Sequence, residues 1–194
     1  MSNYHQNIKD ALPDPKRVKK IKKDLESKGV KYIYSNWIDF LGSPKTKPMP
    51  ISDFEDLCAG KGPQFAVHSV SFVPELTPAD NDQIPVPDLD SLVICPWDKT
   101  CAWVFADLYW NDKPYDVCPR MTLKRQIKKC EKSDLKFFVG IEPEFFLMKW
   151  DGDKPVKAID RDPIPLRRQA FGYDAEYSID GMNFLKEIID ILNN

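Results

Sequence analysis

The stretch from Val139 to Leu147, "VGIEPEFFL", places two glutamates in the middle of an apolar run. Aromatic and β-branched residues favour strands, and phenylalanines on both sides of the glutamates favour a buried one. We therefore predict a buried strand over residues 135–150, and the two carboxylates in it require an explanation.

Successive side chains of a strand alternate between its faces, so Glu142 and Glu144 project to the same side, with Cα atoms roughly 6.5–7 Å apart. Like charges at this distance repel, and their burial is costly unless a positive charge is near. Carboxylate oxygens suit Mg²⁺ or Mn²⁺, so the pair predicts a divalent metal site. Two alternatives stay open: solvated glutamates on an exposed edge strand, and the paired carboxylates of a retaining glycosidase, which more often come from different strands.

Charge and cysteine usage limit the classes of partner. The 194 residues carry a net charge of -2, which gives no electrostatic basis for binding nucleic acid or an anionic membrane. The 5 cysteines include no C-x-x-C pair, so neither a zinc site nor a disulfide framework is expected. The N-terminus shows no apolar signal segment, and no run approaches the ~18 apolar residues of a membrane span. We expect a cytoplasmic protein with reduced thiols.

The first half of the chain reads as two helices, the second a short one in "ISDFEDLCAG" over residues 51–60, and several strands. Residues 1–15 are expected to form a polar arm, and a helix follows up to Gly29. Residues 30–50 predict two strands around a turn, although prolines weaken the second. An extended segment is expected over 65–74, a Pro- and Asp-rich loop up to residue 90, and then a hairpin over 91–110.

The pattern changes after a boundary near Asn111 to Asp116. Residues 119–134 predict a helix whose apolar face carries Leu123, Ile127 and Cys130. After the glutamate strand we expect a turn, a long loop over 161–174, and an amphipathic helix from Met182 to the last residue.

The glutamate strand resembles a known motif. "VGIEPEFFLMKW" is similar to the G-x-E-x-E-F motif of the glutamine synthetase family. Three other stretches also resemble this family: "WIDFLGSPKTKPMP", "CPRMTLKRQIKK" and "YDAEYSIDGMNFLKEIIDIL". The segments "FAVHSVSFVP" and "PWDKTCAWVFADLYW" are more similar to its γ-glutamylmethylamide synthetase-like branch.

The resemblance implies an α+β fold in two parts. After the arm over residues 1–15, residues 16–113 would form a β-grasp-like N-terminal domain. Residues 114–194 would begin the catalytic domain, a curved antiparallel sheet with helices. Family members are more than twice as long, so the resemblance implies that the other metal ligands and the arginines that bind glutamate and ATP lie outside this chain.

The resemblance also implies a reaction. ATP phosphorylates the γ-carboxylate of glutamate, and an amine then displaces phosphate, with Mg²⁺ or Mn²⁺ stabilising the phosphoryl oxygens. Matched to the motif, Glu142 would bind the metal beside the transferred phosphate, and Glu144 the metal nearer glutamate. Family members assemble as homo-oligomers of stacked hexameric rings, with active sites shared between neighbouring subunits.

One departure from the family concerns the amine site. The family's F-D-G-S-S segment, whose Asp helps to bind ammonium, corresponds to "FAVHS", which has Ala66 at the Asp position. His68 and Ser69 would complete this site, which would accept ammonia or a bulkier alkylamine. The 194 residues alone are expected to be inactive. The alternative to a ligase is a non-catalytic, truncated or split relative that serves as a binding or assembly module.

Overall fold

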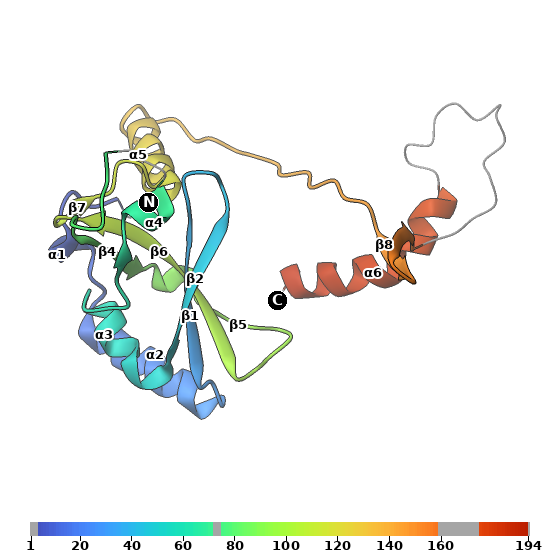
Figure 1. Ribbon diagram of the computed structural model, residues 1–194, viewed down its shortest axis with the longest axis horizontal. Coiled ribbons are helices and arrows are strands. Elements are labelled where there is room, and N and C mark those ends of the chain that lie inside the picture. Colours follow the sequence, from blue (N-terminus) through green and yellow to red (C-terminus); the bar gives the residue numbers. More distant parts are fainter. Residues whose placement is uncertain (1–3, 72–74, 159–174, 194) are drawn as a thin grey trace. The chain divides into compact units, whose positions relative to one another are not determined.

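A computed structural model describes residues 4–71, 75–158 and 175–193, and the chain divides into two compact units (Figure 1). The first unit contains residues 1–138 and the second residues 139–194. The fold belongs to the α+β class, as predicted. The domain limits inferred from the sequence stay a prediction.

A mixed sheet forms the centre of the first unit. Its strands lie in the order β2-β1-β6-β4-β3, and β1 is parallel to β6 whereas the other neighbours are antiparallel. The amide of Asn36 in β1 donates to the carbonyl of Val104 in β6, 68 residues further along the chain. The strands are β1 Tyr32–Ile38, β2 Pro44–Pro50, β3 Phe65–Ala66, β4 Asp82–Pro87 and β6 Cys101–Trp110, with β5 Val93–Ile94 and β7 Lys113–Pro114 paired to β6.

The predicted hairpins are confirmed, and Asp39 explains the turn of the first. Its buried carboxylate accepts hydrogen bonds from the backbone N–H groups of Leu41 and Ser43, at 2.9 and 2.8 Å. Gly42 takes a φ of 80°, which an L side chain rarely adopts. The second hairpin joins β5 to β6, and β6 is the central strand, with most of its residues buried.

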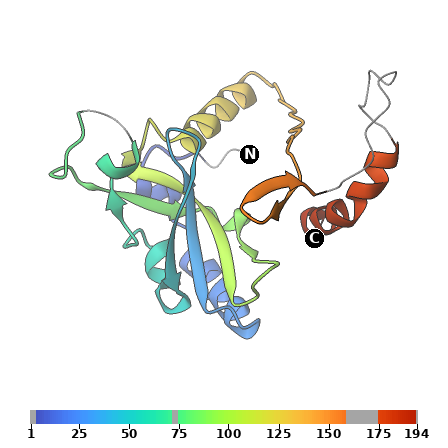
Figure 2. The ribbon, with the colours of Figure 1, turned by 45° about the vertical axis from the view of Figure 1, so that its right-hand side comes forward.

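Helices cover the sheet at both ends. The helix predicted up to Gly29 is α2, and α2 and α3 lie side by side (Figure 2). Their apolar side chains pack on Ile33 of β1 and on Ala102 and Val104 of β6 to form one core cluster. The helices of this unit are α1 Ile8–Ala11, α2 Pro15–Ser27, α3 Phe54–Cys58, α4 His68–Ser71 and α5 Pro119–Lys132, with short 3-10 turns at Ile51–Asp53 and Leu89–Ser91.

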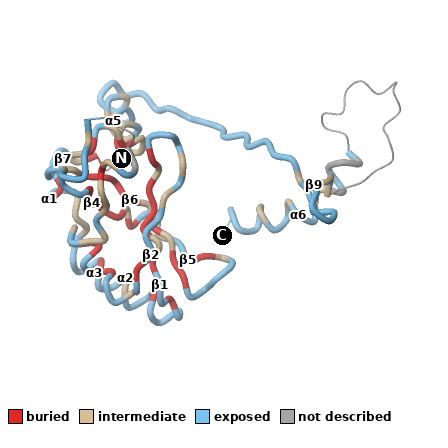
Figure 3. The backbone as a smooth tube through the Cα atoms, in the orientation of Figure 1, coloured by how far each residue is buried: buried red, intermediate tan, exposed pale blue. Residues whose placement is uncertain are grey.

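A second core cluster corrects the expectation of a polar N-terminal arm. Tyr4 and Ile8 are buried among Leu108, Tyr109 and Met121, so the described part of residues 1–15 packs against the sheet. Figure 3 shows that the buried positions of the chain concentrate in the first unit. Helix α5 was predicted correctly, but its buried residue is Met121, whereas Leu123 and Ile127 are exposed.

The predicted loop before residue 90 contains strand β4. Its Pro85 and Pro87 lack the N–H donors that a central strand needs. The backbone N–H of Asp88 donates to the carbonyl of Phe105 in β6. Because backbone groups alternate in direction along a strand, those of residues 84, 86 and 88 face β6, and those of Pro85 and Pro87 face away from it. Beyond Gln83 the far edge of β4 pairs with no described strand. The extended segment expected over 65–74 is corrected over residues 65–71, where Phe65–Ala66 forms a strand and His68–Ser71 forms α4; residues 72–74 lie outside the described residues.

The second unit contains the hairpin of β8 Met148–Asp151 and β9 Lys154–Lys157, and helix α6 Ala175–Asn193. The strand predicted over 135–150 begins only at Met148, so residues 135–147 correct that expectation. They pair with no described strand, and their side chains are exposed except for Leu147, which is half-buried. The loop expected over 161–174 lies outside the described residues. In the described ranges, no helix is long and apolar enough to cross a membrane.

Candidate functional site

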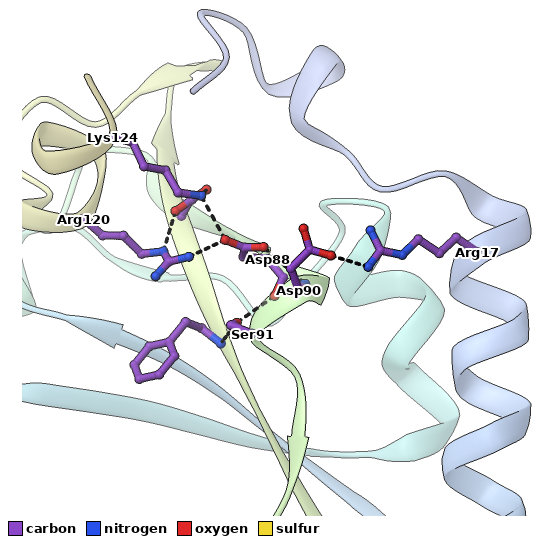
Figure 4. A network of polar contacts seen from close by, with 8 residues as sticks. Arg17, Asp88, Asp90, Ser91, Arg120 and Lys124 are labelled. Atoms are coloured by element: carbon purple, nitrogen blue, oxygen red, sulfur yellow. Dashed lines mark hydrogen bonds and ion pairs between the residues drawn. The ribbon is translucent and has the colours of Figure 1, made fainter. Parts of the chain in front are cut away.

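Four charged side chains form a network between α5 and the sheet of the first unit (Figure 4). Arg120 and Lys124 reach from α5 toward two carboxylates, Asp88 after β4 and Asp107 in β6. Arg120 pairs with Asp88, and its Nε lies 2.9 Å from Asp107 Oδ1. The Nζ of Lys124 lies 3.0 Å from Asp88 Oδ2 and 2.6 Å from Asp107 Oδ2. The network therefore fixes α5 to the sheet.

The sequence accounts for this geometry. Arg120 and Lys124 are four residues apart on a helix and therefore project from the same face. Burial alone would raise the pKa of Asp88, but the hydrogen bond from Lys124 and the charges of Lys124 and Arg120 outweigh it and lower that pKa. Two cations offset two anions, so the network offers no unpaired acid or base and is structural. An aspartate inside the apolar strand "WVFADLYW" was the signal that could have revealed it.

The predicted amine-site residues lie on β3 and α4. The Oγ of Ser69 is 3.4 Å from Nε2 of His68. Ala66 pairs with Asp82 of β4, and directly opposed residues of antiparallel strands project to the same face of the sheet. The ring of Phe65 stacks on Trp37 at 4.0 Å with 5° between the planes, which anchors the segment to β1. Ala66 is thus held opposite one carboxylate, that of Asp82, which the sequence analysis did not identify.

The predicted metal ligands lie in the second unit. Glu142 and Glu144 are exposed and belong to the segment without strand pairing. Their oxygen donors suit Mg²⁺ or Mn²⁺, but two carboxylates are fewer than such an ion needs. Nowhere in the described part of the chain do three or more His, Cys, Asp or Glu side chains gather in a group that could hold a metal. These residues therefore do not make a complete metal site.

Most of the cysteines are buried. All five are free thiols, four of them buried and Cys130 half-buried. Burial raises the pKa of Cys58 to about 12, with a smaller effect from the charge of Glu55. A thiol with such a pKa stays protonated near neutral pH and is unreactive.

Comparison with known proteins gives consistent matches. The family model described as "Glutamine synthetase, catalytic domain" matches residues 116–194. A glutamine synthetase of Rhizobium meliloti (strain 1021) is 33% identical over 165 residues, which cover 85% of this chain and 36% of that protein. A glutamate–methylamine ligase of Methyloversatilis universalis is 32% identical over 127 residues, which cover 64% of this chain and 28% of that protein.

The fold is also similar to solved structures. The structure "GmaS/ADP complex-Conformation 1" matches with a TM-score of 0.54 and 26% identity, over 58% of this chain and 26% of that chain. The structure "Apo GmaS without ligand" gives a TM-score of 0.55, also at 26% identity. The chain spans about a third of the length of the curated relatives that it matches.

Proposed function

Because the chain belongs to the glutamine synthetase family, we propose that it is part of an ATP-dependent ligase that joins ammonia or a small alkylamine to the γ-carboxylate of glutamate. One observation carries the proposal: the match to a ligase extends over 85% of the chain. The activity is proposed for the complete protein, since this chain spans about a third of such a ligase.

The two halves of the chain would have different tasks. Residues 16–113 would form a β-grasp-like N-terminal domain, which the hairpin of β1 and β2 in a mixed sheet supports. Residues 114–194 would begin the catalytic domain, in keeping with the family model over 116–194. In the complete protein such subunits would close into stacked hexameric rings, with each site shared by two subunits.

The proposed reaction has two steps. A γ-carboxylate oxygen of glutamate attacks the γ-phosphorus of ATP, which forms γ-glutamyl phosphate and releases ADP. The amine nitrogen then attacks the acyl carbon, phosphate leaves with the electrons of the broken C–O bond, and the nitrogen loses a proton. The products are a γ-glutamyl amide, ADP and phosphate.

Glu142 and Glu144 are the proposed contribution of this chain to metal binding. A segment in extended form carries both carboxylates on one side, and its phenylalanines would bury it once neighbouring strands pair with it. The further ligands would come from outside the described residues. A bound Mg²⁺ or Mn²⁺ would offset negative charge on the phosphoryl oxygens.

The amine site is proposed at Ala66, His68 and Ser69, with Asp82 as a neighbouring carboxylate. Ala66 removes a side chain where the family has an aspartate, which leaves space for an alkyl group. Asp82 lies opposite Ala66 and would supply a negative charge to an ammonium ion from one strand away. This arrangement favours a small alkylamine over ammonia.

An assay of the complete protein tests the function. Phosphate release that requires ATP, glutamate and an amine together is expected, with a higher kcat/KM for methylamine than for ammonia. Asp82→Asn should lower kcat/KM for both amines, whereas Asp56→Asn, a matched change at an exposed carboxylate, should not. A folded protein that releases no phosphate with any amine would support the non-catalytic alternative. A higher kcat/KM for ammonia would overturn only the amine assignment.

A further inference from the structure

Several buried polar atoms of the first unit have no protein partner. In the described ranges these are Ser35 Oγ, Trp37 Nε1, Tyr115 Oη and both amide atoms of Gln83. Gln83 is fully buried, and Trp37 and Tyr115 are 4% and 7% exposed. Proteins rarely leave such groups unsatisfied, because each has lost its hydrogen bonds to water. Something other than protein is expected to satisfy them.

Three of these four residues line one small cavity. Trp37 comes from β1, Gln83 from β4, and Tyr115 from the segment before α5; Leu108 and Cys118 also contribute to the wall. The cavity offers the centre of a water molecule a volume of about 10 Å³, close to what one ordered water requires.

The unpaired atoms define what can occupy the cavity. The indole N–H of Trp37 only donates, the amide of Gln83 donates and accepts, and the hydroxyl of Tyr115 can do either. Asp39 also lines the wall, but its carboxylate already accepts hydrogen bonds from the backbone N–H groups of Leu41 and Ser43 and pairs with Lys45. An ammonium ion only donates and would face the Trp37 donor, whereas an anion only accepts and would face the Gln83 carbonyl. Water donates and accepts, and about three partners are typical of a buried one. We propose that the cavity binds one ordered water molecule, held by Trp37, Gln83 and Tyr115.

The bound water would have a structural consequence. It would link β1, β4 and the entry to α5, three segments distant in the sequence. It would also fix the indole of Trp37, on which the ring of Phe65 stacks at 4.0 Å. Loss of the water would therefore loosen β3 as well as the cavity wall.

The Tyr115→Phe variant tests the proposal by the sign of its effect. Phenylalanine keeps the ring and its edge-to-face contact with Trp110 and removes only the hydroxyl. If the hydroxyl binds water, the melting temperature should fall by about 2–4 °C. If the cavity is dry, deleting an unpaired hydroxyl should leave the melting temperature unchanged or raise it, which would overturn the proposal. Tyr32→Phe, at a half-exposed tyrosine, is the matched control and should have no effect.

A crystal structure of the complete protein, grown without ammonium salts, gives an independent test. Density for one water within hydrogen-bond distance of the three side chains is expected, and an empty cavity would overturn the proposal. The melting temperature should respond equally to ammonium chloride and sodium chloride. A rise specific to ammonium would show that the occupant is a cation and not water.

Discussion

The Nζ of Lys124 lies 2.6 Å from Asp107 Oδ2, so a helix after the sheet is fixed to its central strand by a charge pair that is about nine-tenths buried on both sides. Without Lys124, Arg120 would be the one cation of the network left to offset both Asp88 and Asp107. The dependence is mutual, because Lys124 and Arg120 also need Asp88 and Asp107 to offset their charge.

Lys124→Met should destabilise the first unit. The variant leaves two buried carboxylates with Arg120 as their one remaining cation, and removing a partner from buried ion pairs costs about 3–5 kcal/mol. The free energy of unfolding, measured with urea, gives the loss. Lys129→Met removes the same charge from an exposed position of α5 and should change this free energy by less than about 0.5 kcal/mol. Equal effects of the two variants would contradict a structural role for the network.

Asp88 should make the free energy of unfolding depend on pH in the acidic range. Its pKa is lowered in the folded protein, so its contribution is fully present above the ordinary aspartate pKa of about 3.9 and is lost as the pH falls through the lower, folded value. The free energy of unfolding should therefore decline in this acidic range. Asp88→Asn should be less stable at neutral pH and should show a shallower decline. Parallel curves for the variant and the native chain would exclude Asp88 as the cause.

Glu142→Ala and Glu144→Ala should each weaken metal binding by the complete protein. The loss should exceed the about 10–100-fold that removing an outer partner of a metal ligand typically costs, and turnover should fall with it. Titration with Mn²⁺ gives the affinity directly. Asp153→Ala, at the exposed turn between β8 and β9, is the control. Normal affinity and activity in both glutamate variants would remove them from the ligand set.

The isolated 194-residue chain should self-associate and should not hydrolyse ATP in response to glutamate. Phe137, Phe138 and Phe146 are 81%, 87% and 93% exposed in a segment that also has unpaired backbone groups. Light scattering after size-exclusion chromatography gives the mass across a concentration series. The double variant Phe138→Lys/Phe146→Lys should shift the mass toward the monomer. A monodisperse native fragment with glutamate-dependent ATP hydrolysis would refute the expectation.

Local patterns in the sequence predicted the elements whose backbone hydrogen bonds form within one helix or one hairpin. The helix α2 and the hairpins β1–β2 and β5–β6 follow from apolar spacing and from turn residues such as Gly42. Strand β4 was missed because it contains Pro85 and Pro87. Proline fits a strand only where its missing N–H would face no neighbouring strand. Only the topology shows that the backbone of both prolines faces away from β6.

The prediction of a strand over residues 135–147 was wrong for a different reason. Their composition predicts a strand, but a strand forms only with a neighbour to accept its hydrogen bonds, and no described strand pairs with them. The candidate site was affected in the same way. The sequence predicted Glu142, Glu144 and Ala66 as site residues, and these stay predictions. Asp82 became a candidate only when the register of β3 and β4 placed it opposite Ala66.

The parallel pairing of β1 with β6 has a consequence for the order of events during synthesis. The hairpin of β1 and β2 contains only local contacts and can form as soon as it leaves the ribosome. Its other edge must wait until β6 is made, because the partner of Asn36 is 68 residues further along. Until then β1 exposes an edge that could pair with another nascent chain. Slow translation between residues 50 and 100 should therefore lower the yield of folded protein.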